Sequence, residues 1–378
     1  MQVITYKFKV YTQNRNHSKR LNEWFKIACW IYNHCISLHK RYYKLYKRTL
    51  LKSRLQTHIA KMKNRCYTKW KLVNAQSAQQ IVERIYLGFD KFFKKENKRP
   101  PTYKKWQKYR SITFKQSGYA LHGNILSINS IKLKLKFHLS RPIDGKIQTV
   151  SVKKDSSGDW WVLFVIKKEI NLKNQKPKTG LSAGLDFGLR NFLTSSDGSV
   201  IHFPCFYTDA LKLIRKQTKL LHRKQKSSKG YEKEKHKLSL LYRRIRNLRS
   251  DFQWKIAHKI ISKYDIICIE SLNLKGMIKI WGRKVNDLSF FNFTQILSTL
   301  CIKYNKTLIK INRWTPTTST CFTCGYKAEN MSLKTRTWIC PNCKTIHDRD
   351  VNAAKNILRV GMSTLRGGTV RPQIIGVF

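Results

Sequence analysis

Two cysteine pairs decide the fold of this chain: Cys321-Phe322-Thr323-Cys324 and, after fifteen further residues, Cys340-Pro341-Asn342-Cys343. Pairs at this spacing are typical of a tetrahedral zinc site made of four thiolates. Such a site leaves no ligand position open, so the predicted zinc is structural. The alternative is two disulfides, which the reducing interior of a cell disfavours.

The residues directly after the second pair place acids at the start of a helix. They are His347-Asp348-Arg349-Asp350-Val351-Asn352-Ala353-Ala354, and the helical pattern continues to Leu358. Asp350 is either a plain helix N-cap or a metal ligand. Glycines and arginines follow from residue 361 to 378, and we expect this tail to be mobile.

Two further acids sit at the ends of apolar, strand-like segments. Asp186 lies in Gly184-Leu185-Asp186-Phe187-Gly188, and Glu270 ends the segment 265–270. A nuclease that uses two Mg²⁺ ions needs several carboxylates converging on them, and oxygen is the ligand that Mg²⁺ prefers. Each acid alone has an ordinary structural explanation. The three in this order, with the cysteines before the last, favour a nuclease of the RNase H type.

Composition indicates a polyanionic partner. The 378 residues include 77 Lys and Arg against 20 Asp and Glu, a net charge of +57, while 41% hydrophobic residues indicate a folded chain. No acid occurs between Glu23 and Glu83, which favours a nucleic-acid surface over a solvated helix face. The longest apolar run, 160–166, is too short for a membrane, and the N-terminus lacks signal-peptide features. We expect a cytoplasmic, nucleoid-associated protein without a membrane partner. Six cysteines outside the pairs should be reduced core thiols: Cys29, Cys35, Cys66, Cys205, Cys268 and Cys301.

Hydrophobic periodicity predicts a multidomain α+β chain. A first strand at 1–14 joins a small β-barrel at 100–176, and a helical block at 15–99 is inserted between them. Residues 171–178 form a linker. A nuclease domain with a basic helical pair occupies 177–312, the cysteine module 313–346, the end of the nuclease domain 347–360 and the tail 361–378.

The chain resembles the TnpB family of transposon-encoded RNA-guided DNA endonucleases, relatives of the type V CRISPR effectors. Four segments carry the resemblance most specifically: 184–188, 269–277, 318–325 and 348–357. Two segments depart from the family pattern, at Gln253-Trp254 and at Leu288-Ser289-Phe290-Phe291.

The resemblance implies a wedge barrel with a helical recognition insertion and an RNase H-like RuvC nuclease domain with an inserted zinc ribbon. It implies that Asp186, Glu270 and Asp350 hold two catalytic Mg²⁺ ions, with Asp348 beside them as a supporting residue. Cys321, Cys324, Cys340 and Cys343 would hold one Zn²⁺. It further implies a guide RNA from the transposon end, a double-stranded DNA target with a short adjacent motif, and a monomeric protein with its RNA. The alternatives are an RNA-guided binder that does not cut, a DDE transposase, and a basic zinc-ribbon protein with accidental acids.

Overall fold

The structure is a computed structural model that describes residues 2–11, 15–65, 67–169, 177–329, 331–332 and 335–366. The chain divides into two compact units, Met1–Ile170 and Asn171–Phe378. Among the described residues, no helix is both long and apolar enough to cross a membrane. Three predictions lie outside the described residues: a buried thiol at Cys66, a linker over 171–176 and a mobile tail over 367–378.

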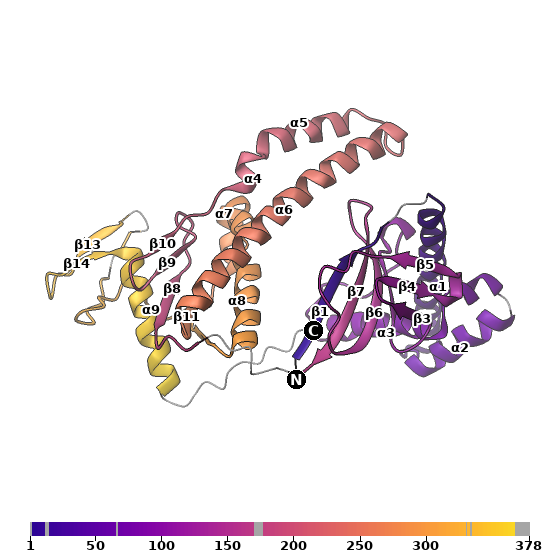
Figure 1. Cartoon of the computed structure of the whole chain (residues 1–378), viewed down its shortest axis with the longest axis horizontal. Helices are drawn as coiled ribbons and strands as arrows, with labels where there is room; N and C mark the ends of the chain where they lie inside the picture. Colours follow the sequence, from indigo (N-terminus) through magenta and orange to yellow (C-terminus); the bar gives the residue numbers. More distant parts are fainter. Residues whose placement is uncertain are drawn as a thin grey trace. The chain divides into compact units, whose positions relative to one another are not determined.

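The first unit contains two antiparallel sheets (Figure 1). One has the strand order β1-β7-β6-β2, with β1 Gln2–Lys9, β2 Ser111–Phe114, β6 Lys146–Lys154 and β7 Trp160–Lys168. The other joins β3 Tyr119–His122, β4 Ile125–Ile128 and β5 Leu133–Lys136. The first strand pairs with β7 as predicted, Gln2 opposite Lys168 and Lys9 opposite Trp161. Closure of these sheets into a barrel stays a prediction.

Helices fill the insertion between β1 and β2. They are α1 Arg15–Tyr46, α2 Lys52–Arg65, α3 Ala75–Phe93 and the 3₁₀ turns η1 Thr68–Leu72 and η2 Trp106–Lys108. A further 3₁₀ turn, η3 Asn129–Ile131, follows β4. The apolar face of α1 packs on the sheet, where the Trp24 ring stacks on Phe114 at 5.7 Å. Asn74 caps α3 by accepting a 2.7 Å hydrogen bond from the backbone of Ser77.

The second unit is built on a five-stranded mixed sheet of order β10-β9-β8-β11-β12. Its strands are β8 Ser182–Asp186, β9 Leu193–Ser195, β10 Val200–Ile201, β11 Ile266–Glu270 and β12 Thr307–Ile311. β8, β11 and β12 run parallel, whereas β9 and β10 are antiparallel to their neighbours. The central positions of β8 and β11 are buried, because helices cover both faces of the sheet.

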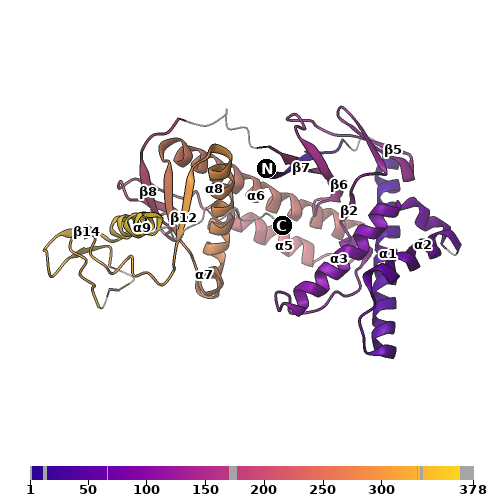
Figure 2. The same ribbon diagram turned by 90° about the horizontal axis from the view of Figure 1, so that it is seen from below.

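Six helices are described in this unit. They are α4 Phe206–Asp209, α5 Leu211–His222, α6 Lys229–Lys263, α7 Leu274–Leu288, α8 Phe290–Tyr304 and α9 Arg349–Arg366. Helices α6 and α8 share one hydrophobic core with one face of the sheet. Helix α9 covers the other face, where its Ile357 packs with Cys268 of β11 and Ile309 of β12 (Figure 2). A small hairpin of β13 Thr337–Ile339 and β14 Ile346–Asp348 precedes α9.

Two predictions from the sequence are wrong. Helix α9 continues through Gly361 to Arg366, because the glycine lets the helix lie against β11: a Cβ there would be 2.3 Å from the Cys268 sulfur. Cys205 is exposed, since it occupies the turn before α4 instead of a core position. The sequence did not predict α7, in which Gly276 and Gly282 interrupt the apolar pattern.

The two segments that depart from the family pattern meet in the structure. The fully buried Gln253 amide donates to the carbonyl oxygens of Leu288 at 2.9 Å and Ser289 at 3.2 Å. Asn292 donates to the Gln253 side-chain oxygen at 2.6 Å. The glutamine thereby satisfies the backbone where α7 gives way to α8, at Ser289 with a positive φ of 51°.

Candidate active site and metal centre

Two of the three predicted acids lie at the same edge of the five-stranded sheet. Asp186 is the last residue of β8 and Glu270 the last of β11. The two strands are parallel and hydrogen-bonded neighbours, with Leu185 opposite Ile269. Their carboxyl ends therefore meet at one edge, where open α/β sheets characteristically bind ligands.

Helix α9 brings the third acid to this edge. The helix lies directly on β8 at Gly184, where an added Cβ would be 2.0 Å from the Ala354 carbonyl oxygen. Asp350 lies in the first turn of α9, one helical turn before Ala354. Asp186 lies two residues beyond Gly184, at the end of β8. Carboxylates are favourable at such a helix N-terminus because its unpaired amides carry partial positive charge.

The electrostatics of the site reflect this convergence. The pKa of Asp186 is raised to about 7 by burial, then by the charges of Asp350 and Glu270, and Arg349 partly offsets the effect. Burial raises the pKa of Glu270 to about 7, opposed by a hydrogen bond with Thr317. A buried carboxylate whose pKa is raised further by two neighbouring carboxylates marks a site suited to cations.

Basic and polar side chains surround the acids. Arg336 lies 3.5 Å from a carboxylate oxygen of Asp350. Asp348 is the helix cap, because its carboxylate accepts a 2.9 Å hydrogen bond from the backbone of Val351. The capping role considered for Asp350 thus falls to Asp348, and the Asp350 carboxylate is left to the acidic cluster.

The four predicted cysteines converge in a single cluster. Their Sγ atoms all lie within 4.8 Å of one another, and the pairs Cys321–Cys343 and Cys324–Cys340 are 3.6 Å apart. These separations are too long for disulfides, whose sulfurs are about 2.05 Å apart. They match the roughly 3.8 Å between sulfurs around a tetrahedral zinc with bonds of about 2.3 Å. The four thiols therefore fit one Zn²⁺.

Two equivalent turns bring the cysteines together. The Gly325 amide donates to the Cys321 carbonyl at 3.0 Å, and the Lys344 amide donates to the Cys340 carbonyl at 2.9 Å. The turn residues Gly325 and Lys344 both have positive φ, 78° and 58°. The Thr345 hydroxyl and backbone lower the pKa of Cys343 to about 6, which favours the thiolate that binds metals.

Side chains missed in the sequence connect the cysteine cluster to α9. The buried His347 ring places Nε2 3.0 Å from the Cys321 sulfur. Asn352 accepts from the Phe322 backbone at 2.9 Å, and Asn356 donates to the Thr317 and Thr320 carbonyls at 2.8 and 2.6 Å. The sequence did contain a sign of the two asparagines' shared role, since they lie four residues apart and therefore on one face of the predicted helix. No pattern in the neighbouring sequence distinguished Thr317 as a partner of Glu270.

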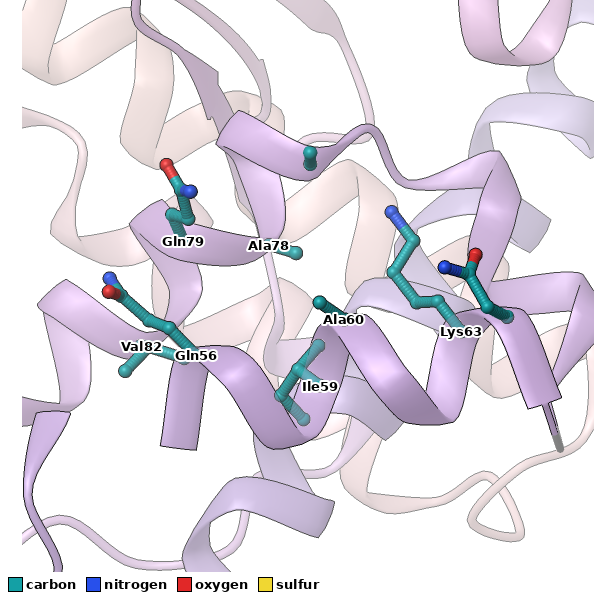
Figure 3. A pocket seen from close by; sticks show the side chains of 9 residues that line it. Gln56, Ile59, Ala60, Lys63, Ala78, Gln79 and Val82 are labelled. Atoms are coloured by element: carbon teal, nitrogen blue, oxygen red, sulfur yellow. The ribbon is translucent and has the colours of Figure 1, made fainter. Parts of the chain in front are cut away.

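Two hollows lie away from the acids. One in the first unit has a volume of about 170 Å³ between α2 and α3, with Ile59, Ala78 and Val82 at its floor and Gln56 and Gln79 at its rim (Figure 3). It has no acid, cysteine or histidine among its lining residues and is a packing gap between the helices. The other, of about 500 Å³, lies between α6 and α7 beside the ion pair of Arg249 and Asp287, which are 2.9 Å apart.

Together, the mixed sheet, the carboxylates at its edge and the adjacent four-cysteine cluster define an α/β protein with two distinct candidate metal sites. Two family models match the chain: a probable transposase family, OrfB_IS605, over residues 150–281, and the Cas12f1-like TNB domain over residues 290–357.

Individual relatives agree with these matches. A candidate RNA-guided DNA endonuclease of Streptomyces pristinaespiralis is 29% identical over 307 residues, which cover 80% of this chain and 75% of that protein. The TnpB-like protein L79 of Acanthamoeba polyphaga mimivirus is 31% identical over 60% of this chain, but the alignment covers only 46% of L79. The chain is thus similar to TnpB-like proteins and RNA-guided DNA endonucleases, the resemblance that its sequence motifs predicted.

A solved structure shares the fold. The chain is similar to the protein in a Cas12f1–sgRNA–target DNA complex, with a TM-score of 0.58 and 16% sequence identity. The similarity covers 91% of this chain and 83% of that one. At this identity the similarity establishes the fold alone.

Proposed function

We propose that this protein is an RNA-guided DNA endonuclease that hydrolyses phosphodiester bonds at Asp186, Glu270 and Asp350. The observation that carries the proposal is the convergence of three acids, distant in sequence, at the carboxyl edge of the sheet, where the charges of two of them raise the pKa of the third. The strand order, with two antiparallel strands beside three parallel ones, supports an RNase H-like domain of the RuvC type.

In this proposal the three acidic residues would hold two Mg²⁺ ions. Hard cations take carboxylate oxygens, and bound cations would offset the burial and the like charges that together keep the Asp186 pKa high. The chemistry that such a pair of ions supplies is activation of the attacking water and stabilisation of the leaving oxygen. Within the chain, Thr317 orients Glu270 by a hydrogen bond, and Asp348 fixes the start of the helix that carries Asp350.

The cysteine cluster fits a structural Zn²⁺. Four thiolates complete a tetrahedral shell, so substrate has no position on the metal. The wedge, recognition, nuclease and zinc-ribbon assignments made from the sequence belong to the same proposal, in which the cysteine module contacts the target nucleic acid.

The proposed partners are a guide RNA transcribed from the transposon end and a DNA duplex with a short adjacent motif. The names of the relatives and the net charge of +57 support them. In this class of protein, base pairing selects the sequence while the protein binds backbone and shape. We propose that a monomer acts with its RNA in the nucleoid. A guided binder that does not cut and a DDE transposase are the alternatives, and the presence of all three acids disfavours the first.

The test is purification of the protein co-expressed with its flanking genomic DNA. Any RNA that remains bound is sequenced, and the complex is incubated with a matching duplex library in Mg²⁺. We expect a discrete RNA and guide-dependent cutting that Asp186→Ala abolishes without loss of binding. Guided binding without cutting would support the binder, strand joining without resident RNA the transposase, and heterogeneous RNA without guided binding would refute RNA guidance.

A further inference from the structure

The loop between β12 and the cysteine cluster is attached at both ends to the carboxylate site. At its start, the Ser271 amide, next to Glu270, donates to the Ile311 carbonyl at 3.2 Å. At its end, the Thr317 side chain is hydrogen-bonded to Glu270, and Asn356 on α9 donates to the Thr317 carbonyl at 2.8 Å. The loop therefore leaves from the sheet edge that carries the acids and returns to it.

Trp314 lies in the middle of this loop and is unusually exposed. Its exposed fraction is 75%, whereas no other described tryptophan exceeds 44%. The turn beneath it is fixed, because the Trp314 amide donates to the Asn312 side chain at 3.1 Å. The Arg313 guanidinium lies 4.7 Å from the ring centroid. A large apolar ring is thus held in solvent with a cation on its face.

This combination suits a nucleobase with its phosphate. Every base offers a flat face to an aromatic ring, and an adjacent guanidinium can pair with the backbone anion. Duplex bases are already stacked on one another, so the ring is available only to a single-stranded segment. We propose that Trp314 stacks on a base of the DNA strand that enters the carboxylate site, with Arg313 on its backbone, and holds that strand beside the acids. The inference rests on the proposed function and adds a substrate-binding residue to it.

The first test does not require cutting. Single-stranded DNA oligonucleotides carrying one 2-aminopurine are titrated onto the RNA-loaded protein in Ca²⁺, because stacking quenches this base. We expect wild type and Trp314→Tyr to quench it, and Trp314→Leu, which keeps apolar bulk without a π face, to lose quenching and bind about tenfold more weakly. Equal quenching by the leucine variant, or quenching with RNA oligonucleotides alone, would overturn the inference.

The second test measures single-turnover cutting of a matching duplex. Trp314→Leu should slow cutting about tenfold, Trp314→Tyr should restore most of the rate, and Arg313→Gln should have a smaller effect. Unchanged zinc content and melting temperature would establish that the variants fold. If wild type cuts and the leucine variant cuts equally fast, Trp314 has no such role and the proposed function stands. If wild type does not cut, the proposed function fails, and the fluorescence titration still decides whether Trp314 stacks.

Discussion

The cysteine cluster and the carboxylate site are joined by the short loop between Ile311 and Cys321, yet they are assembled in different ways. All four cysteines come from residues 321–343, and two equivalent turns bring their sulfurs together. The acids come from two strands and a helix spread over residues 186–350, and only the packing of α9 on the sheet unites them. A local site tolerates distant changes, whereas an assembled site depends on every contact that fixes its elements.

The largest expected effect comes from breaking the local site. Cys340→Ser should abolish zinc binding, since a structural zinc contributes about 10–16 kcal/mol in small domains, and cutting should be lost with it. Zinc content of the purified protein, circular dichroism and cutting are measured together. Because the five-stranded sheet is built elsewhere, helix and strand content should change little. Cys205→Ser is the matched control, an exposed cysteine outside the cluster that should leave all three unchanged.

Breaking the assembled site should impair cutting while leaving guide, target and zinc binding intact. Glu270→Gln keeps the shape of the side chain but removes a charge that we assign to metal binding. Cutting should fall by at least about a hundredfold, because each such ligand contributes several kcal/mol to stabilising the transition state. Guide and target binding, measured by gel shift, should stay at the wild-type level, as should zinc content. A variant that still cuts at the normal rate would remove Glu270 from the mechanism.

The raised pKa of Asp186 predicts that the carboxylate site lowers the free energy of unfolding at neutral pH. The folded protein holds the proton up to about pH 7, whereas an unfolded aspartate loses it near the ordinary value of 3.8. The free energy of unfolding should therefore fall as pH rises from about 4 to 7 and then level off. Asp186→Asn lacks this contribution, so in Mg²⁺-free buffer at pH 8 it should be about 4 kcal/mol more stable than wild type.

Urea unfolding of both proteins at several pH values measures this difference. Added Mg²⁺ should reduce it, since the wild-type acids then have cationic partners. A difference that does not vary with pH would contradict the electrostatic origin.

The close packing of α9 can be tested at Gly184. Gly184→Ala places a Cβ against the Ala354 carbonyl and should destabilise the protein by about 1–3 kcal/mol, as overpacking does. Because the helix must shift, cutting should fall as well. Gly230→Ala in α6 is the control: its nearest neighbour would be 3.7 Å away, so it should be neutral or mildly stabilising. Equal urea midpoints for the two variants would argue against the contact.

The smallest effect is expected at Thr317. Thr317→Val keeps the shape of the side chain and removes the hydroxyl bonded to Glu270, which contributes about 1 kcal/mol. Cutting should slow several-fold with zinc content unchanged. Thr317→Ser, which retains the hydroxyl, should restore the rate in the same single-turnover assay. Failure of serine to rescue would indicate that the methyl group matters instead.

Local sequence patterns were enough to predict those parts of the molecule that form within one short segment or one strand. The spacing of Cys321 to Cys343 predicted a cluster that the structure contains, because two short turns suffice to close it. Apolar runs ending in Asp186 and Glu270 predicted β8 and β11, because buried parallel strands need apolar side chains on both faces. The motifs around these residues also predicted the similarity to TnpB-like proteins.

Features that depend on contacts between distant segments could be identified in the fold alone. The fold buries Asp186 and brings the charges of Asp350 and Glu270 near it, which raises its pKa. The helix α9 also continues through Gly361, where it packs on Cys268. The same holds for Thr317, an ordinary threonine in sequence that reaches Glu270 only because its loop returns to the sheet edge. Such roles leave no periodic or spaced pattern, since the energy that selects them arises between residues far apart in the chain.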